Sequence, residues 1–222
     1  EADQYITDGR VTINGIVAQM GTKISLDDII AVDGEKISKK NIKKLYIIFN
    51  KPKGIVCTTD SGVEKDNIID YINHPQRIFP IGRLDKTSEG LIFLTNDGDI
   101  VNKILRAKNK HEKEYYVSVD KPINSDFIKK MSNGIPILNT VTRKCEVKFV
   151  KDYEFKITLT QGLNRQIRRM CESLGYRVKK LKRIRIMNIK IDIPIGQWRY
   201  FSNEELSDLK NLLSNSTSNY GS

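Results

Sequence analysis

IFPIGRLDKTSEGLIFLT, residues 78–95, places a charged loop between two apolar runs. The runs Ile78–Ile81 and Leu91–Thr95 have the length and composition of buried strands. The loop between them, Gly82–Gly90, carries an Arg, an Asp, a Lys and a Glu within seven positions. A loop at the edge of a rigid sheet can present such side chains to a ligand. Taken alone, however, the loop is better explained as a polar turn in which Asp85 hydrogen-bonds its own backbone.

Length and composition predict a globular protein: 222 residues, of which 39% are hydrophobic, suffice for one large domain and a small one. No run approaches the roughly 18 apolar residues of a membrane span, and the first residues do not look like a secretory signal. We therefore expect a cytoplasmic protein without membrane contact. Three cysteines at irregular spacing and only two histidines predict neither a disulfide framework nor a metal site.

The charge balance is the strongest global signal. The chain has 38 Lys and Arg residues against 27 Asp and Glu residues, a formal net charge of +11. Such an excess attracts a polyanion along its whole length, so nucleic acid is the expected partner. An acidic membrane surface is the rival, but no basic amphipathic helix with an aromatic face is visible in the sequence.

The first part of the chain predicts a small module. A helix that ends at Thr7 precedes the hairpin Val11–Ala18, a further strand follows at Ile29–Val32, and the basic stretch Lys36–Lys44 predicts a linker. The V-T-I-N-G hairpin resembles part of an RNA-binding module named after a small-ribosomal-subunit protein. A small β-meander without an RNA role explains these residues equally well.

The rest of the chain predicts an α+β fold, in which a mixed, mostly antiparallel sheet has flanking helices. The expected strands are Leu45–Phe49, Ile55–Thr58, Glu114–Val119, Cys145–Val150, Glu154–Thr160 and Met187–Ile193, with a turn at Asn50–Gly54. The expected helices are Asp99–Ala107 with Asp99 as N-cap, Ser125–Met131, a helix capped by Asn164 and ended by Gly175, and Asn203–Leu213. The resulting domains are 1–40 (module and linker), 41–213 (main domain) and 214–222 (polar tail).

A second informative stretch, QGLNRQIRRMC at Gln161–Cys171, opens a basic segment. On the expected helix Ile167 faces the core, and Arg168, one position further, lies at the border of the buried stripe. Between Leu163 and Arg185 there are nine cations against one acidic residue, so we expect a phosphate backbone to dock there. The residues expected to contact it are Arg165, Gln166, Arg169, Lys179, Lys180, Lys182 and Arg183.

Three separated residues, Asp85, Tyr115 and Arg168, present groups that could converge on one site. A partly buried Arg beside an Asp favours the charged carboxylate and fixes its direction, as a nucleophile requires. A Tyr offers a flat face for a base and a hydroxyl for proton transfer. Each also has a simpler explanation, Tyr115 as a core aromatic and Arg168 as a phosphate contact or a structural ion pair.

Ordered motifs cover nearly the whole chain: G-R-L-D-x-x-[TS]-x-G-L at 82–91, L-T-N-D-G at 94–98, K-x-Y-x-V at 113–117 and G-L-N-R-Q-I-R-R-M at 162–170. Together they resemble the signature motifs of the pseudouridine synthases that modify small-subunit and large-subunit ribosomal RNA. Within that group, H-E-K-E-Y at 111–115, R-I-M-N at 185–188 and G-Q-W-R at 196–199 are most similar to a large-subunit enzyme.

The resemblance implies a role for each matching residue. Asp85 attacks the uridine or its sugar, the glycosidic bond breaks, and the uracil turns so that its C5 rejoins the sugar. Arg168 pairs with Asp85, while Tyr115 stacks on the base. Arg83 enters the space that the flipped nucleotide leaves. The apolar walls of the pocket are expected to be Ile167 and Leu181.

The resemblance also implies an isomerase without a cofactor, because uracil is both the leaving group and the returning nucleophile. The expected substrate is a specific, unpaired or flipped-out uridine of large-subunit (23S) ribosomal RNA, with tRNA as a second candidate. We expect a monomer, since no long apolar face stands out. The main alternative is a non-catalytic ribosome-assembly factor that only binds rRNA; a nuclease lacks the clustered carboxylates that hold metal ions.

Overall fold

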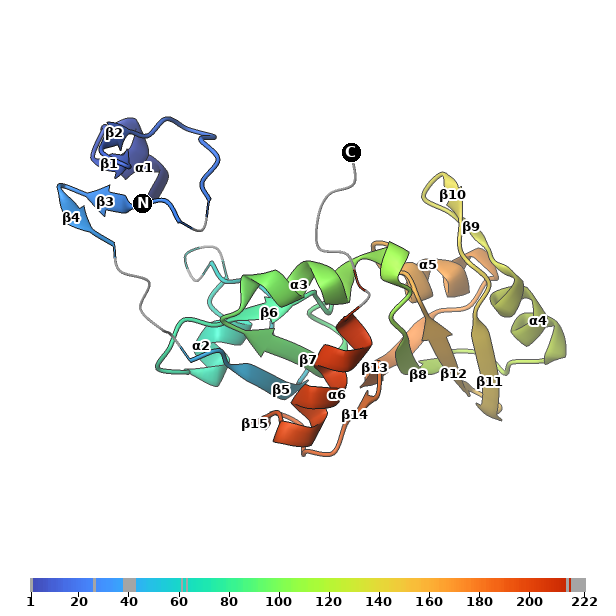
Figure 1. Cartoon of the computed structure of the whole chain (residues 1–222). Coiled ribbons are helices and arrows are strands. Elements are labelled where there is room, and N and C mark those ends of the chain that lie inside the picture. The colour runs from blue at the N-terminus through green and yellow to red at the C-terminus, as the bar shows by residue number, and fades with distance from the viewer. Residues whose placement is uncertain are drawn as a thin grey trace. The chain divides into compact units, whose positions relative to one another are not determined.

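The computed structural model describes residues 2–25, 27–37, 43–60, 62, 64–214 and 216. The chain divides into two compact units, Glu1–Lys43 and Lys44–Ser222 (Figure 1). Most of the predicted linker and of the predicted polar tail lies outside the described residues. None of the described helices is long and apolar enough to cross a membrane.

The small unit consists of one helix and a four-stranded antiparallel sheet in the order β2-β1-β3-β4. Its elements are α1 (Ala2–Thr7), β1 (Val11–Ile13), β2 (Ile16–Val17), β3 (Ile30–Val32) and β4 (Glu35–Lys36). Asn14 and Gly15 have positive φ angles, as the tight turn between β1 and β2 requires. The predicted helix end, hairpin and third strand are confirmed, whereas β4 occupies the beginning of the predicted linker.

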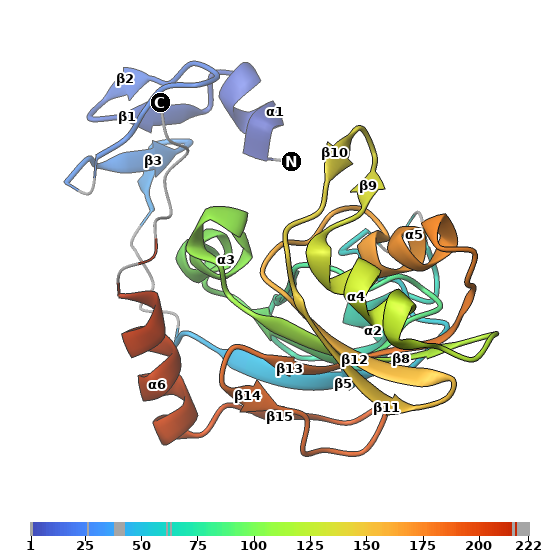
Figure 2. The same ribbon diagram turned by 90° about the vertical axis from the view of Figure 1, so that its right-hand side faces the viewer.

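The large unit is built on a nine-stranded sheet in the order β11-β12-β8-β13-β7-β5-β15, with β14 beside β13 and β6 beside β7 (Figure 1). Figure 2 shows the same sheet turned by 90°. Neighbouring strands are antiparallel except β7 and β13, which run parallel. The strands are β5 (Tyr46–Lys51), β6 (Phe79–Ile81), β7 (Glu89–Thr95), β8 (Lys113–Val119), β11 (Glu146–Lys151), β12 (Glu154–Leu159), β13 (Val178–Ile186), β14 (Ile189–Lys190) and β15 (Trp198–Tyr200). The predicted α+β class with a mixed, mostly antiparallel sheet is confirmed.

In the described part of the chain, six helical elements flank this sheet, and most begin at a side chain that caps their free N–H groups. Asn124 caps α4 through Phe127 N, and Ser202 and Glu205 form a reciprocal capping box at α6. The helices are α2 (Ile68–Ile72), α3 (Gly98–Leu105), the 3₁₀ helix η1 (Ala107–Asn109), α4 (Ser125–Asn133), α5 (Gln166–Ser173) and α6 (Asn203–Leu213). A separate hairpin is formed by β9 (Pro136–Ile137) and β10 (Thr140–Val141).

Strands β5 and β7 are buried on both faces, because successive residues pack into different clusters. Ile48 and Phe93 pack with α3 and α6, whereas Phe49 and Ile92 pack with α2. Tyr115 of β8 contacts both the α2 cluster and the cluster under α4 and α5, so these three helices lie on one face of the sheet. We call it the site face, and the opposite one the reverse face.

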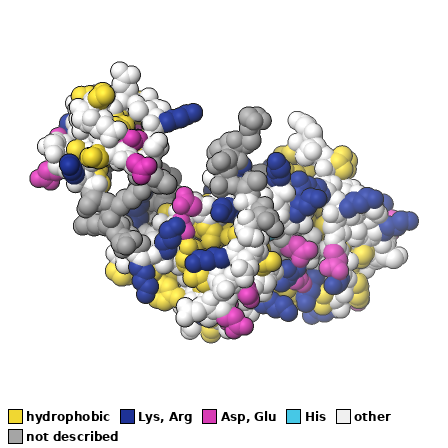
Figure 3. All heavy atoms as spheres, in the orientation of Figure 1, with side chains coloured by type: hydrophobic (Ala, Val, Ile, Leu, Met, Phe, Trp, Pro, Cys, Tyr) yellow, Lys and Arg dark blue, Asp and Glu magenta, His cyan; other side chains and the backbone are white. Residues whose placement is uncertain are grey.

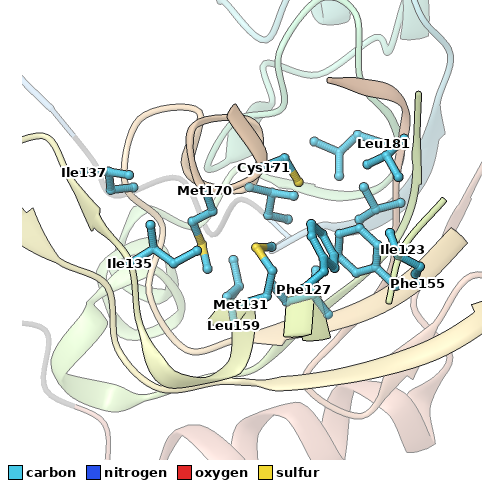
Figure 4. Packing of buried hydrophobic residues seen from close by; sticks show 14 residues of the cluster. Ile123, Phe127, Met131, Ile135, Ile137, Phe155, Leu159, Met170, Cys171 and Leu181 are labelled. Atoms are coloured by element: carbon cyan, nitrogen blue, oxygen red, sulfur yellow. The ribbon is translucent and has the colours of Figure 1, made fainter. Parts of the chain in front are cut away.

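The cluster under α4 and α5 closes the other half of the sheet (Figure 4). Phe127 of α4 meets Phe155 of β12 with ring centroids 5.2 Å apart, and Met170 and Cys171 of α5 complete the contact. The predicted inward alternation of β12 is confirmed, since Phe155, Ile157 and Leu159 are all buried. The sheet therefore gives α5, which carries the basic motif, a rigid base.

Several local predictions were wrong, each because a tertiary contact overrides the local pattern. The expected turn after Phe49 instead continues β5 through Lys51, and the expected strand Ile55–Thr58 makes one isolated bridge, from Val56 to Asn67. Asp97, not Asp99, caps α3. The second half of the basic segment Leu163–Arg185, expected to dock a phosphate backbone, is β13, an interior strand of the sheet.

Candidate active site

The loop between β6 and β7 holds Asp85 at the site face. Its backbone is fixed at three points: Ser88 N donates to Asp85 O (2.9 Å), Gly54 N donates to Lys86 O (2.8 Å), and Leu84 N donates to Sγ of Cys57 (3.4 Å). The Leu84 side chain is buried, while the Asp85 side chain is 32% exposed. The loop is thus anchored to the core and still presents its carboxylate to solvent.

Two arginines of the stretch Gln161–Cys171 approach the carboxylate of Asp85. Nε of Arg168 lies 3.4 Å from Oδ2 of Asp85, and one terminal nitrogen of Arg165 lies 3.6 Å from the same oxygen. Arg168 lies in the first turn of α5 and is buried, whereas Arg165 is exposed. The two positive charges attract the carboxylate and restrict its direction.

Arg165 reaches Asp85 from a strained backbone position. It occupies the N-cap of α5 with φ of +49°, the left-handed region that side chains other than glycine and asparagine rarely adopt, and it makes no side-chain capping bond. The predicted cap, Asn164, instead accepts hydrogen bonds from Arg169 through its carbonyl (3.1 Å) and its side chain (3.2 Å). Asn164 as N-cap was therefore a wrong prediction.

The remaining nitrogens of Arg168 are held by the loop that carries Asp85. One terminal nitrogen donates to Oγ1 of Thr87 (3.2 Å) and to Oγ of Ser88 (3.1 Å), and the other donates to Val178 O (3.4 Å). Nε forms no hydrogen bond to any described residue. We call Thr87, Ser88 and Val178 O the guanidinium clamp, because together they leave only Nε directed at Asp85.

A second buried cation lies beneath the loop. Lys51 of β5 is fully buried, and its Nζ donates to Pro52 O (2.9 Å) and Ile55 O (2.8 Å). Burial lowers the pKa of Lys51, and the nearby charges of Asp85 and Glu89 act in the opposite direction. Lys51 therefore places a hydrogen-bonded amino group on the interior side of the site.

Tyr115 lies on the site face of β8, opposite Ile157 of β12 and Arg183 of β13. It is partly buried where the cluster of α2 meets the cluster of α4 and α5. Arg83, at the start of the loop, is exposed, and its side chain makes no hydrogen bond or ion pair to the described residues. Tyr115 is thus half-buried on the site face, and Arg83 is exposed in the loop that carries Asp85.

Two of the residues expected to contact RNA are core residues. Gln166 is buried, and its side chain accepts from Leu163 N (3.0 Å). Arg183 is also buried, and its Nε donates to Leu91 O (2.6 Å) across the parallel pair of β7 and β13. These contacts correct the surface placement expected for Gln166 and Arg183.

Two further cations lie on the wrong side of the sheet for this site. Lys180 and Lys182 stand opposite Ser118 and Tyr116 in the register, and these alternate with Tyr115 along β8. They therefore project from the reverse face, where Lys180 pairs with Glu89 (3.3 Å). Arg165 lies beside Asp85 on the site face, Arg169 is half-buried and donates to Asn164, and Lys179 is exposed.

The expected pocket walls, Ile167 and Leu181, are both members of the core cluster under α5. Sequence reasoning missed Lys51, Thr87 and Ser88 as parts of the site. Lys51 could have been suspected, because it directly follows five apolar or amide residues of a buried strand. The hydroxyl roles of Thr87 and Ser88 had no sequence signal beyond their closeness to Asp85.

Chemically, the site offers one oriented carboxylate flanked by two guanidinium groups. Within the described part of the chain, no group of three or more His, Cys, Asp or Glu side chains is arranged to hold a metal ion. A carboxylate positioned in this way can attack an electrophilic carbon or stabilise a developing positive charge.

Comparison with known proteins gives three findings. Residues 45–173 match the family described as RNA pseudouridylate synthase. The dual-specificity RNA pseudouridine synthase RluF of Escherichia coli K12 is 57% identical over 220 residues, which cover 98% of this chain and 76% of that protein. Ribosomal large subunit pseudouridine synthase B of Bacillus subtilis is 34% identical over 191 residues, 82% of this chain and 78% of that protein.

A solved structure also has a fold similar to that of this chain. A crystal structure of a pseudouridylate synthase matches with a TM-score of 0.72 at 28% identity, and the match covers 94% of this chain and 92% of the other. The matched region includes both units of the chain, since 94% exceeds the share of either unit alone.

Proposed function

Because this chain belongs to the family of RNA pseudouridine synthases, we propose that it converts a specific uridine of large-subunit (23S) ribosomal RNA to pseudouridine. The family and the isomerase activity were predicted from the motifs, and both predictions are confirmed by these relatives. RNA is therefore the substrate class, whereas the choice of RNA and the residue roles are our proposals.

In the proposed reaction Asp85 is the nucleophile. It attacks the uridine or its sugar, and the bond from N1 of uracil to the sugar breaks. After the base has turned, C5 of uracil bonds to the sugar and the bond from Asp85 to the substrate breaks, which restores the free carboxylate. The C5 proton is lost and N1 gains one, so atoms and charge balance without a cofactor. Tyr115 stacks on the base and Arg83 occupies the space of the flipped nucleotide.

The observation that carries this proposal is the approach of Arg168 to Asp85. The 3.4 Å contact and the guanidinium clamp fix the carboxylate on an anchored loop. A carboxylate in an ordinary polar turn would not need a buried arginine held by three acceptors.

We further propose that a second RNA, tRNA, is a substrate. The Escherichia coli relative, with 57% identity, is a dual-specificity enzyme. Arg165 and Arg169 on the site face supply sequence-independent phosphate contacts, and such contacts position an RNA without choosing its sequence. An unpaired loop common to both RNAs would then meet Asp85 in the same way.

The test is the reaction itself with large-subunit rRNA and tRNA transcripts, read out by base-specific chemical labelling of pseudouridine. Asp85→Asn should abolish isomerisation and leave RNA affinity within about threefold, because it removes the nucleophile and keeps the shape of the side chain. Asp99→Asn is the matched control, since Asp99 is 92% exposed and pairs with Lys44, which lies outside the loop. Activity retained by Asp85→Asn would refute Asp85 as nucleophile.

The alternative is a ribosome-assembly factor that binds rRNA without chemistry. It predicts tight binding and no labelled position in any RNA treated with the wild-type protein. We also propose that the enzyme is a cytoplasmic monomer; sedimentation velocity with and without RNA, and the enzyme's distribution in fractionated cells, test both points.

A further inference from the structure

The hairpin of β9 and β10 has an unusual residue at its tip. Its loop is only two residues long, because Ile137 pairs with Thr140, and the two loop residues, Leu138 and Asn139, have φ angles of +49° and +58°. Such a turn requires positive φ at both positions and normally uses Asn, Asp or Gly. Asn139 fits this requirement, whereas a bulky Leu138 in this conformation is strained.

Burial does not explain Leu138 either. Its side chain is 46% exposed, and nearby Val141 is 62% exposed. A leucine that is both strained and solvent-exposed contributes little to folding. Its presence at the tip therefore points to a contact outside the folded chain.

The base of the hairpin, in contrast, is rigid. Thr142 and Ile135 exchange two hydrogen bonds, from Ile135 N to Oγ1 (2.9 Å) and from Thr142 N to Ile135 O (3.0 Å). A Cβ at Gly134 would lie 2.4 Å from Thr142 O, so only glycine permits this close approach. Ile137 is buried in the core cluster that also contains Ile167 of α5. The base of the hairpin is consequently fixed against α5, the helix that begins after Arg165 and contains Arg168.

The surroundings of the hairpin are basic. Residues Lys121–Lys144, which contain α4 and the hairpin, hold five cations and one acidic side chain, Asp126. Lys and Arg side chains gather over this part of the large unit in Figure 3. An apolar tip surrounded by cations suits a nucleic acid, whose phosphates meet the cations while its bases offer apolar faces.

We propose that Leu138 is an apolar wedge that inserts between two stacked bases of the RNA substrate and helps to hold the target uridine out of the stack. The inference rests on the proposed function and adds a residue outside the motifs. The strain at the tip is then part of the device, because it directs the side chain away from the protein and toward the RNA.

The first test uses Leu138→Asn, which suits the turn and lacks the wedge. On a stem-loop RNA kcat/KM should fall roughly tenfold, and weakening the base pairs beside the target uridine should restore most of it, since less unstacking is then needed. Leu212→Ala is the matched control, because Leu212 of α6 is 50% exposed and lies outside the hairpin. A Leu138→Asn enzyme with wild-type kcat/KM on the stem-loop would overturn the proposal.

A second measurement separates the wedge from a structural role. Asn and Gly both tolerate positive φ, so Leu138→Asn and Leu138→Gly should melt at the same temperature as wild type or higher. A lower melting temperature, together with an equal loss of kcat/KM on the stem-loop RNA and on the RNA with weakened base pairs, would show that Leu138 only supports the fold.

A third measurement reads unstacking directly. In an Asp85→Asn background, a fluorescent base analogue beside the target uridine should brighten on binding, and much less when Leu138 is also replaced. Equal brightening would contradict the wedge. If wild-type protein forms no pseudouridine, the proposed function fails, whereas the fluorescence comparison still decides the role of Leu138.

Discussion

Nε of Arg168 lies 3.4 Å from Oδ2 of Asp85, while the other nitrogens of Arg168 donate to the hydroxyls of Thr87 and Ser88 and to Val178 O. Because Thr87 and Ser88 follow Asp85 in the same loop, the loop orients the arginine that in turn orients its carboxylate. Loop and helix α5 therefore define the direction of the carboxylate together, and each part of this arrangement can be removed separately.

Arg168→Lys should lower kcat about 100-fold and change KM less than about threefold. A lysine keeps the charge but cannot bond two hydroxyls, a carbonyl and a carboxylate at once. Single-turnover rates with saturating RNA measure this effect. Arg185→Lys is the control, since Arg185 pairs with Glu112 and Glu114 and not with Asp85. An Arg168→Lys enzyme within twofold of wild type would show that charge alone suffices.

Ser88→Ala should lower kcat roughly tenfold, and Thr87→Ala should have a similar or smaller effect. Since both hydroxyls hold one terminal nitrogen, the double variant should lose less than the product of the single losses. Ser132→Ala is the control: Ser132 donates to Ile128 O (2.8 Å), so its loss affects stability by about 1 kcal/mol and leaves kcat unchanged. A wild-type kcat for both single variants would show that the hydroxyls of the guanidinium clamp do not contribute to catalysis.

Gly90→Ala should destabilise the large unit by about 3 kcal/mol or more. Gly90 has φ of +109°, and a Cβ there would lie 2.2 Å from Arg183 O, where β7 and β13 run side by side. Gly98→Ala is the matched control, because it meets no atom within 4 Å and starts a helix; it should be neutral or stabilising by up to about 1 kcal/mol. Urea unfolding of the two variants measures the difference, and equal stability would contradict the close approach.

The sequence predicts well wherever a pattern is local. The apolar runs around the Asp85 loop correctly predict β6 and β7, and the alternation of Phe155, Ile157 and Leu159 correctly predicts β12. These patterns suffice because a continuous apolar run indicates a strand buried on both faces, as in β7, whereas a strand with one buried face repeats every two residues, as in β12. The candidate catalytic Asp and Arg were found for a different reason, since their motifs resemble those of known enzymes.

Strand β13 could not be predicted from its pattern. It is central in the sheet, yet Lys180 and Lys182 project from its reverse face beside Tyr116 and Ser118, so the strand resembles a basic surface segment. Only the pairing with β8 on one side and β7 on the other shows which cations face the site. Burial of Arg183 likewise depends on Leu91 O, which lies far away in sequence.

Lys113→Met should change how stability depends on pH. Lys113 is half-buried at the start of β8, its Nζ donates to His111 O (3.3 Å), and burial, with a smaller effect of Arg183, lowers its pKa to about 8. Between about pH 8 and 10.5 the unfolded chain therefore binds more protons than the folded chain, so wild-type stability should rise with pH across this window.

Below pH 8 Lys113 is charged in the folded protein, so the free energy of unfolding is reduced by the full cost of burying that charge. At pH 7 Lys113→Met should then be more stable than wild type by up to about 3 kcal/mol, and this advantage should vanish near pH 10.5. Urea midpoints measured from pH 6 to 11 for both proteins give the difference, with exposed Lys129→Met as the control. A stability difference that stays constant across that range would contradict a charged, buried Lys113, whereas the expected convergence would show that this motif lysine is kept at the expense of stability.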